Sequence, residues 1–289
     1  MLDFAAKRKK LKDAIKSPQI LEIPGAFNAI CARLVENNGY QAAYISGAAT
    51  TCGAFALPDI GLISLQETVK EVQKIARAVS IPCIVDADTG FGETAQIPIT
   101  IQTFEAHGAA SVHLEDQVFP KRCGHLAGKE LIAKEDMSKK IEAAVKSRKD
   151  PNFVVIARCD AFSVTGMDDM IDRLKTYRDA GADMVFPEAL TELKQYEKVV
   201  KEVGIPVLAN MTEFGKTPFY TSKQYEAAGC SAVIFPVSLL RHAMGAIQKA
   251  LEIMKAHGNQ EPLVKEMYTR QQFYDLIEYD PAKEFTRKY

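Results

Sequence analysis

Hydrophobic and polar positions follow two patterns along this chain. Short continuous runs rich in Val, Ile and Ala are separated by longer stretches in which apolar residues recur every three or four positions. Continuous apolar runs are typical of strands buried on both faces, and the longer spacing is typical of helices. The continuous runs predict eight strands, at residues 20–28, 42–46, 82–88, 111–116, 153–160, 183–188, 206–212 and 232–238.

The stretches around these strands have the length and spacing of helices. The clearest helical runs are residues 1–17, 65–79, 134–147, 167–180, 239–257 and 261–279. At four places a glycine follows a helical run and precedes a strand, which is where glycine commonly ends a helix. These glycines are Gly39, Gly108, Gly181 and Gly229.

The alternation of strands and helices predicts an α/β fold, a parallel (β/α)₈ barrel of the TIM type. The alternative is an open, doubly wound sheet. The chain has 289 residues and no linker or shift in composition, so we expect one barrel domain over residues 1–289. Residues 259–289 exceed what a barrel needs. We expect them to form a helical extension of the same domain, packed on its own barrel or on a neighbouring subunit.

Charge and cysteine content argue against several classes of partner. The formal net charge is −1, so no strong field attracts nucleic acid or an anionic membrane. No apolar run approaches the ~20 residues that span a bilayer, and the first residues lack a signal-peptide pattern. The six cysteines are scattered without a CxxC pair, which argues against a zinc site and favours a reducing, cytoplasmic location.

Polar side chains gather at one end of almost every predicted strand. In a TIM barrel the active site lies at the carboxyl ends of the strands. Buried charges are costly unless they are paired or bind a ligand, so a purely structural barrel would not need this arrangement. The strand-end residues are Tyr44, Ser46, Asp86, Asp88, Glu115, Asp116, Arg158, Asp160, Glu188, Asn210, Thr212 and Arg241.

Two of these residues suggest a metal site. Asp86 and Asp88 share one face of a strand, because alternate side chains of a strand point the same way. Two carboxylates that close repel each other unless a cation lies between them, and Glu115 is expected on the adjacent strand. Oxygen ligands suit Mg²⁺, for which Mn²⁺ could substitute. The alternative is an aspartate pair that caps the following helix.

The loop after the fourth strand carries a cysteine among cations, Lys121-Arg-Cys-Gly-His125. Positive neighbours favour the ionised form of Cys123, and Gly124 allows a close approach of the backbone to a ligand. The alternative is a solvated basic turn with an incidental cysteine. The planar side chains of Arg158, Arg241 and Arg270 could each hold a carboxylate, which suggests a small substrate with several carboxylates.

With these residues in place, the chain resembles the isocitrate lyase and phosphoenolpyruvate mutase superfamily, and within it the methylisocitrate lyases. The resemblance spans nearly the whole chain. It rests on Lys121-Arg-Cys-Gly-His125, Ser46-Gly47, Leu57-Pro58-Asp59, Asp86-Ala-Asp88, Phe186-Pro-Glu188, Asn210-Met-Thr-Glu-Phe-Gly215 and Thr269-Arg270. Two positions depart from that pattern, because Ala48 stands where glycine is usual and Ile234 where leucine is usual.

The resemblance implies a Mg²⁺-dependent lyase that cleaves the tricarboxylate 2-methylisocitrate to pyruvate and succinate, in the methylcitrate route of propionate breakdown. It also implies a homotetramer in which the C-terminal helix is swapped between subunits. Implied catalytic residues are Tyr44 as base, Cys123 as proton donor, and His125 and Arg158 as groups that stabilise charge. Implied substrate ligands are Ser46, Gly47, Ala48, Cys123, Gly124, Arg158, Glu188, Asn210, Thr212, Arg241 and Arg270, with the metal at Asp86 and Asp88.

Three other functions remain open at this level. A lyase for 2,3-dimethylmalate would share the cysteine and the metal site and differ only in pocket side chains. A phosphonate-forming mutase is disfavoured, because mutases lack the loop around Cys123. A non-catalytic barrel is also disfavoured, because such a protein could lose any of the polar strand-end residues and this chain has the full set. Phe186 and Ile234 are both apolar and favour a substrate methyl group, an effect worth about 1–3 kcal/mol.

Overall fold

The computed structural model describes residues 3–126 and 128–283. In this part of the chain, each predicted strand range contains one parallel strand. The strands are β1 (Leu21–Pro24), β2 (Ala43–Ile45), β3 (Cys83–Asp86), β4 (Ser111–Glu115), β5 (Val154–Cys159), β6 (Met184–Pro187), β7 (Leu208–Asn210) and β8 (Ala232–Phe235). The observed strands are shorter than the predicted ranges, because residues at one or both ends of each range lie beyond the hydrogen-bonded ladder.

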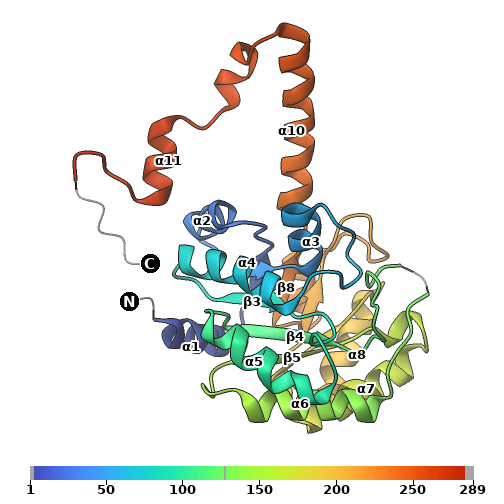
Figure 1. The fold of residues 1–289 in the computed structure, drawn as a ribbon. Coiled ribbons are helices and arrows are strands. Elements are labelled where there is room, and N and C mark those ends of the chain that lie inside the picture. Colours follow the sequence, from blue (N-terminus) through green and yellow to red (C-terminus); the bar gives the residue numbers. More distant parts are fainter. Residues whose placement is uncertain (1–2, 127, 284–289) are drawn as a thin grey trace.

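The strands close into a ring. Five strands pair in the order β2-β3-β4-β5-β6 and three in the order β1-β8-β7. At one junction Ala26 N donates a hydrogen bond to Tyr44 O at 2.8 Å, and at the other Val185 N donates to Pro206 O at 2.9 Å. These two bonds join β1 to β2 and β6 to β7, so the predicted barrel is confirmed over the open sheet (Figure 1).

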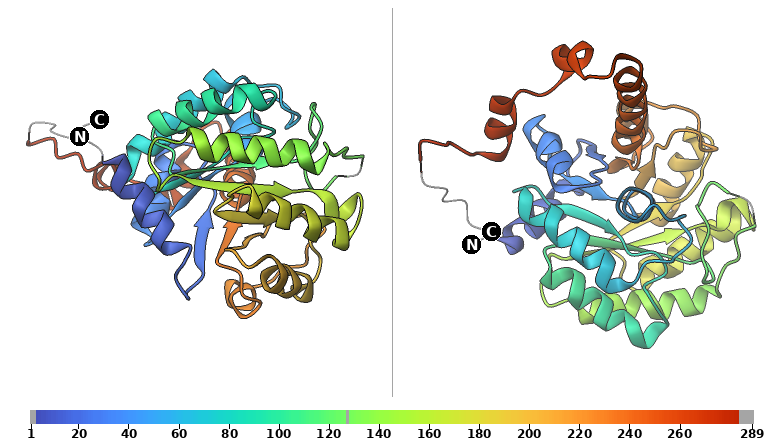
Figure 2. Two further views of the ribbon diagram at one scale, coloured as in Figure 1. Left: turned by 90° about the horizontal axis from the view of Figure 1, so that it is seen from below. Right: turned by 45° about the horizontal axis from the view of Figure 1, so that its top comes forward.

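Helices surround the ring, as both views in Figure 2 show. They are α2 (Ala29–Asn37), α3 (Gly47–Phe55), α4 (Leu65–Ala78), α5 (Ile97–Ala106), α6 (Lys134–Ser147), α7 (Met167–Asp179), α8 (Leu193–Val203) and α9 (Ser222–Ala227). Short 3₁₀ turns lie at Thr94–Gln96 and Ala161–Ser163. All four glycines predicted to end helices have a positive φ, for example +99° at Gly108 and +101° at Gly181.

The inside of the barrel is packed at the amino end of the strands. Ile23, Ile84 and Ile156 point into the ring and are fully or almost fully buried. Leu11 and Ile15, from and just after α1 (Phe4–Ala14), join the same cluster and close that end. A ligand can therefore enter only from the carboxyl ends of the strands.

The chain after β8 leaves the barrel. Helix α10 (Ser238–His257) stands away from the ring in Figure 1, and Leu240 is its one buried residue. A 3₁₀ segment (Glu261–Glu266) and α11 (Arg270–Ile277) follow. Helix α11 returns to its own barrel, where Arg33 Nε on α2 donates to Leu276 O at 3.0 Å.

The prediction of one helix over residues 261–279 was wrong. Met267 is extended, and Thr269 starts a new helix by a capping box with Gln272. The local hydrogen bonds of this cap outweigh the continuous apolar spacing. No helix among residues 3–126 and 128–283 is long and apolar enough to cross a membrane.

Candidate active site

A cavity of about 80 Å³ lies at the carboxyl ends of the strands. Its walls bring together most of the residues that the sequence singled out. They include Tyr44, Ser46, Ala48, Asp86, Cys123, Gly124, His125, Arg158, Glu188, Asn210, Thr212 and Arg241. The loop bearing Cys123 narrows the cavity, because Cys123, Gly124 and His125 form part of its wall.

The two aspartates of the predicted metal site lie against the start of α3. Gly47 N donates a hydrogen bond to Asp86 Oδ2 at 3.1 Å. A Cβ atom added to Gly47 would lie 2.8 Å from Asp86 Oδ2 and 3.3 Å from Asp88 Oδ1. Only glycine therefore leaves room for both carboxylates, which are 6% and 8% exposed. Asp88 has a φ of +45°, so the backbone turns sharply where its carboxylate enters the site.

The charges around these aspartates are unevenly balanced. Burial would raise the pKa of Asp86, but the electrostatic influence of its neighbours His113, Lys121 and Arg158 outweighs burial and lowers this pKa to about 2. Burial and the charge of Asp86 raise the pKa of Asp88 to about 6, although the Lys121 ammonium is 2.8 Å from Asp88 Oδ1. Lys121 also pairs with Asp59, and thereby ties the cysteine loop to the loop before α4.

Glu115 adds a third buried carboxylate. Neither of its oxygens accepts a hydrogen bond from any described residue, and Arg158 Nη1 is 3.3 Å from Oε2. Burial raises the pKa of Glu115 well above its usual value. No group of three or more His, Cys, Asp or Glu residues in the described chain forms a complete metal site. Asp86, Asp88 and the orphaned oxygens of Glu115 nevertheless suit Mg²⁺, which usually keeps several waters and substrate oxygens as ligands.

The loop around Cys123 is held on the barrel by side chains on both sides of the thiol. Gln117 brackets the backbone of Arg122, since its Nε2 donates to Arg122 O and its Oε1 accepts from Arg122 N, both at 2.9 Å. A Cβ atom on Gly124 would overlap Glu188 and Arg158. The glycine therefore lets the loop backbone lie directly on the charged floor of the cavity.

His125 has a defined tautomer. Lys216 N donates to His125 Nδ1 at 3.1 Å, so the ring proton lies on Nε2 and points to Glu188 Oε1, also at 3.1 Å. Asn210 Nδ2 donates to both oxygens of Glu188, at 3.3 and 3.2 Å. Burial alone would raise the pKa of Glu188, but Arg158 and His125 lower it well below its usual range. Glu188 therefore stays ionised and orients the imidazole and amide.

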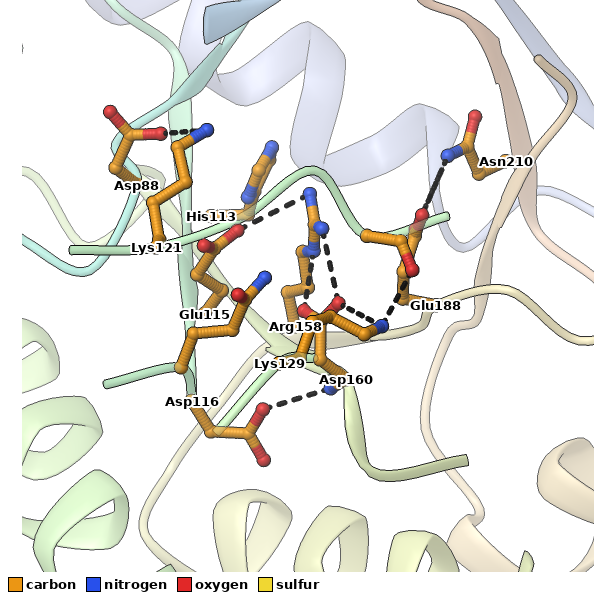
Figure 3. Close-up of polar contacts among 12 residues, drawn as sticks. Asp88, His113, Glu115, Asp116, Lys121, Lys129, Arg158, Asp160, Glu188 and Asn210 are labelled. Atoms are coloured by element: carbon orange, nitrogen blue, oxygen red, sulfur yellow. Dashed lines mark hydrogen bonds and ion pairs between the residues drawn. The ribbon is translucent and has the colours of Figure 1, made fainter. Parts of the chain in front are cut away.

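Arg158 lines the cavity and lies between Glu115, Asp160 and Glu188, as Figure 3 shows. Its Nε is 2.9 Å from Asp160 Oδ2 and its Nη2 is 3.3 Å from Oδ1. Its guanidinium also lies over the ring of Phe186, 5.2 Å from the centroid. These two hydrogen bonds to Asp160 fix the guanidinium in one orientation. Because Arg158 also lines the cavity, its guanidinium can bind an anion there without rearranging.

Tyr44 is paired with a histidine. Its hydroxyl is 2.7 Å from His113 Nε2, and His113 Nε2 is 3.6 Å from Asp86 Oδ1. Burial lowers the pKa of His113 to about 4, so the ring is neutral and Nε2 can accept the phenol proton. Burial also raises the pKa of Tyr44 well above its usual value, so the phenol is not ionised in this pocket.

The far wall carries polar groups from the last strands. Arg241 Nη1 is 2.5 Å from Glu213 O and 3.1 Å from Glu213 Oε2, and Thr212 is nearly buried beside it. On the opposite wall Ser46 caps α3, and Ala48 lies in its first turn, where backbone N–H groups have no helical partner and suit an anion.

Arg270 is the predicted substrate ligand that the structure does not bring to the cavity. It is the exposed first residue of α11, beyond the helix that leaves the barrel. Within one chain Arg270 therefore lies away from the cavity, because the arm carries α11 to α2. Sequence order could not show this, since it depends on the direction in which α10 leaves the barrel.

Several residues in or next to the cavity were not predicted as site residues. Lys121 and Asp59 were recognised only as parts of motifs, although both line the cavity. His113 lies on the strand that leads to the cysteine loop. It is two residues before Glu115, so both side chains point to the same face of the strand, and this spacing could have identified His113 as a site residue. Lys129 gave no signal, because a lysine in a charged loop is normally solvated.

The comparisons agree with this geometry. Residues 11–255 match the family model described as phosphoenolpyruvate phosphomutase. The chain therefore belongs to the phosphoenolpyruvate mutase/isocitrate lyase family. It is 46% identical over 269 residues to 2-methylisocitrate lyase of Aeropyrum pernix, covering 93% of this chain and 86% of that protein.

Solved structures give the same picture. A crystal structure of 2,3-dimethylmalate lyase superposes with a TM-score of 0.88 at 34% identity, covering 96% of this chain and 92% of that one. Phosphonopyruvate hydrolase in complex with oxalate and Mg²⁺ superposes with a TM-score of 0.84 at 27% identity, covering 93% and 94%.

Proposed function

We propose that this chain is a carbon–carbon lyase that cleaves 2-methylisocitrate to pyruvate and succinate, the lyase step of the methylcitrate route of propionate breakdown. The observation that carries the proposal is one cavity that is lined by Asp86, Cys123 and carboxylate-binding groups on opposite walls, with Asp88 bonded to Asp86 beside it. The similarity to 2-methylisocitrate lyases over 93% of the chain supports it.

The polar groups of the cavity match a tricarboxylate. Ser46, Gly47 and Ala48 would hold the carboxylate of the pyruvate half at the start of α3. Asn210, Thr212 and Arg241 would hold the distal carboxylate at the far wall, and Gly124 with Arg158 the carboxylate between them. Glu188 would orient Asn210 and His125 rather than touch the reacting bond.

Asp86 and Asp88 would hold Mg²⁺, or Mn²⁺ in its place, partly through water, and Glu115 would support that shell. When bound, the cation supplies a Lewis acid that lowers the pKa of the substrate hydroxyl and orients the bond to be broken. The Mg²⁺ bound to the similar phosphonopyruvate hydrolase supports this assignment.

The residues of this chain can move the two protons that the cleavage needs. Tyr44 would take the hydroxyl proton of the substrate while its own proton passes to His113 Nε2, 2.7 Å away. The carbon–carbon bond then breaks to give pyruvate and a succinate carbanion that is delocalised into its carboxylate. Arg158 and His125 would stabilise that charge, and the Cys123 thiol would protonate the carbanion carbon. Closure of the loop excludes water from this carbanion.

A second candidate, a 2,3-dimethylmalate lyase, is favoured by the 34% identical solved structure. The two substrates share the metal-side half, with its methyl group, which Phe186 and Ile234 would accommodate in either case. They differ at the far wall, because dimethylmalate has no distal carboxylate. Three polar side chains there, Asn210, Thr212 and Arg241, favour the tricarboxylate, since a polar site left unpaired is penalised.

We further propose a homotetramer with swapped C-terminal arms, in which residues 259–289, which the structure describes as far as residue 283, extend the single barrel domain and α11 exchanges its contact with α2 of its own chain for one on a neighbouring chain. Helix α10 supports this, because Met244, Ile247, Leu251 and Met254 are each more than two-fifths exposed. An apolar stripe of this kind normally packs against a partner. In such an assembly Arg270 would reach a site only on a neighbouring chain. The six free cysteines support a reducing, cytoplasmic location.

Product formation from three substrates tests the proposal. Pyruvate release from 2-methylisocitrate and from 2,3-dimethylmalate, and glyoxylate release from isocitrate, would be measured at equal concentrations. We expect the highest kcat/KM with 2-methylisocitrate. A higher value with dimethylmalate would keep the mechanism and replace the substrate, and no product from any of the three would remove the lyase assignment.

A further inference from the structure

One buried ammonium connects the cysteine loop to the cavity floor. Lys129 Nζ donates to Gly124 O at 2.6 Å and lies 2.8 Å from Asp160 Oδ1. The side chains of Lys129 and Asp160 are 1% and 0% exposed. Figure 3 shows the ammonium at the carboxylate that also holds Arg158. A buried lysine needs such partners, because an unpaired ammonium is costly away from water.

Asp160 is a fixed anchor for this ammonium. Its carboxylate receives the Arg158 fork, and its backbone N–H donates to Asp116 Oδ1 at 2.8 Å. Tyr177 OH, from α7, donates to the other oxygen of Asp116 at 2.8 Å. The chain of contacts thus runs from the helical layer through Asp160 to Lys129, and from there to the carbonyl beside Cys123.

The two contacts of Lys129 act in different directions. Its bond to Gly124 lies within the loop and shapes the backbone next to the thiol. Its ion pair with Asp160 joins the loop to the residue that directly follows β5. When the backbone around Cys123 lifts away from β5, at least one of the two contacts must break, whereas Asp160 keeps Arg158 as partner. Lys129 therefore favours the closed position of the loop. The Asp160 carboxylate does not depend on Lys129, because it also pairs with Arg158.

We propose that Lys129 is a positioning residue that holds the Cys123 loop closed and sets the place of the thiol in the cavity. The effect on loop closure is independent of the substrate, and only its consequence for turnover rests on the proposed lyase function. Lys129 touches no reacting atom, so its role is to raise the population of the closed state.

The accessibility of Cys123 to iodoacetamide tests this in the full chain without any substrate. Methionine fills similar space without charge. In Lys129→Met we expect Cys123 alkylation to accelerate about tenfold or more, which is equivalent to a loss of about 1.4 kcal/mol from the free energy that favours the closed loop. Peptide mass spectrometry would follow Cys123 with exposed Cys52 as the reagent reference and buried Cys83 as the reporter of global unfolding.

Lys7→Met is the matched control. Lys7 is equally buried and donates to two backbone carbonyls, those of Ala76 and Val79, but at the closed end of the barrel. This variant should leave the Cys123 rate unchanged relative to Cys52. Lys129→Gln provides the same comparison if Lys129→Met does not fold.

Three results would overturn the proposal. They are an unchanged Cys123 rate in a folded Lys129 variant, an equal rise in Lys7→Met, and a parallel rise at Cys83, which would mean general loosening. Turnover is measured separately, and kcat is expected to fall in Lys129→Met more than KM changes. An inactive wild-type protein would refute the lyase function and leave the alkylation result valid.

Discussion

Replacing Gly47 by alanine should separate metal binding from stability. Gly47 is the first residue of α3, and its φ is not in the left-handed region, so alanine suits the backbone. The added Cβ would lie 2.8 Å from Asp86 Oδ2, whereas ordinary contacts begin near 3.4 Å. The Asp86 carboxylate must therefore shift by several tenths of an ångström, away from the position that it shares with Asp88.

The expected loss is in Mg²⁺ affinity and turnover rather than in folding. A misplacement of about 1 Å at a reacting centre costs roughly a hundredfold, so a shift of this size should weaken Mg²⁺ binding roughly tenfold or more. The free energy of unfolding of the metal-free protein should change much less, since the reduced freedom of the unfolded chain, about 0.4–1 kcal/mol, offsets part of the cost of moving the carboxylate.

Mg²⁺ titration by calorimetry, together with thermal unfolding in EDTA, measures both quantities. Gly53→Ala is the matched control on the same helix, because its Cβ would meet only Leu240, at 3.4 Å. It should stabilise the protein without changing Mg²⁺ affinity. A Gly47→Ala protein that binds Mg²⁺ within twofold of wild type would refute the placement of the cation at Asp86 and Asp88.

Three further predictions concern pH, specificity and assembly. The pKa of Asp88 is raised from 3.8 to about 6, so its contribution to stability is complete below pH 3.8 and is lost as the pH rises through about 6; the Tm in EDTA should fall across this range and level off above it. Asp88→Asn should flatten this fall. Arg241→Met should raise KM for 2-methylisocitrate about 10- to 100-fold, because a charged hydrogen bond is lost, and leave dimethylmalate kinetics nearly unchanged. Ile247→Glu with Leu251→Glu should convert a tetramer to smaller species in light scattering, whereas Gln248→Lys on the same helix should not.

The barrel could be predicted because its signal is local. Each strand is a continuous apolar run, and glycines such as Gly108 and Gly181 mark the helix ends by their positive φ. The location of the cavity followed from the rule that barrel sites lie at strand carboxyl ends. Residues such as Asp86 and Arg158 were therefore found without knowledge of any distance.

What the sequence did not reveal depends on contacts between distant segments. Lys129 has the sequence context of a solvated lysine, and only the fold places it against Asp160, 31 positions away. The ionisation of Tyr44 depends on its complete burial beside His113. The position of Arg270 depends on the direction in which α10 leaves the barrel, and the apolar spacing of α10 does not predict that direction.

The most direct test of the central claim is Mg²⁺-dependent pyruvate release from 2-methylisocitrate by wild-type protein and by Cys123→Ser. The wild-type protein should form pyruvate and succinate in equal amounts with Mg²⁺ and neither in EDTA. Cys123→Ser should lose far more than tenfold in kcat, since the hydroxyl is a much weaker acid than the thiol. Turnover by Cys123→Ser within about tenfold of wild type, or pyruvate formation in EDTA, would contradict the proposed chemistry.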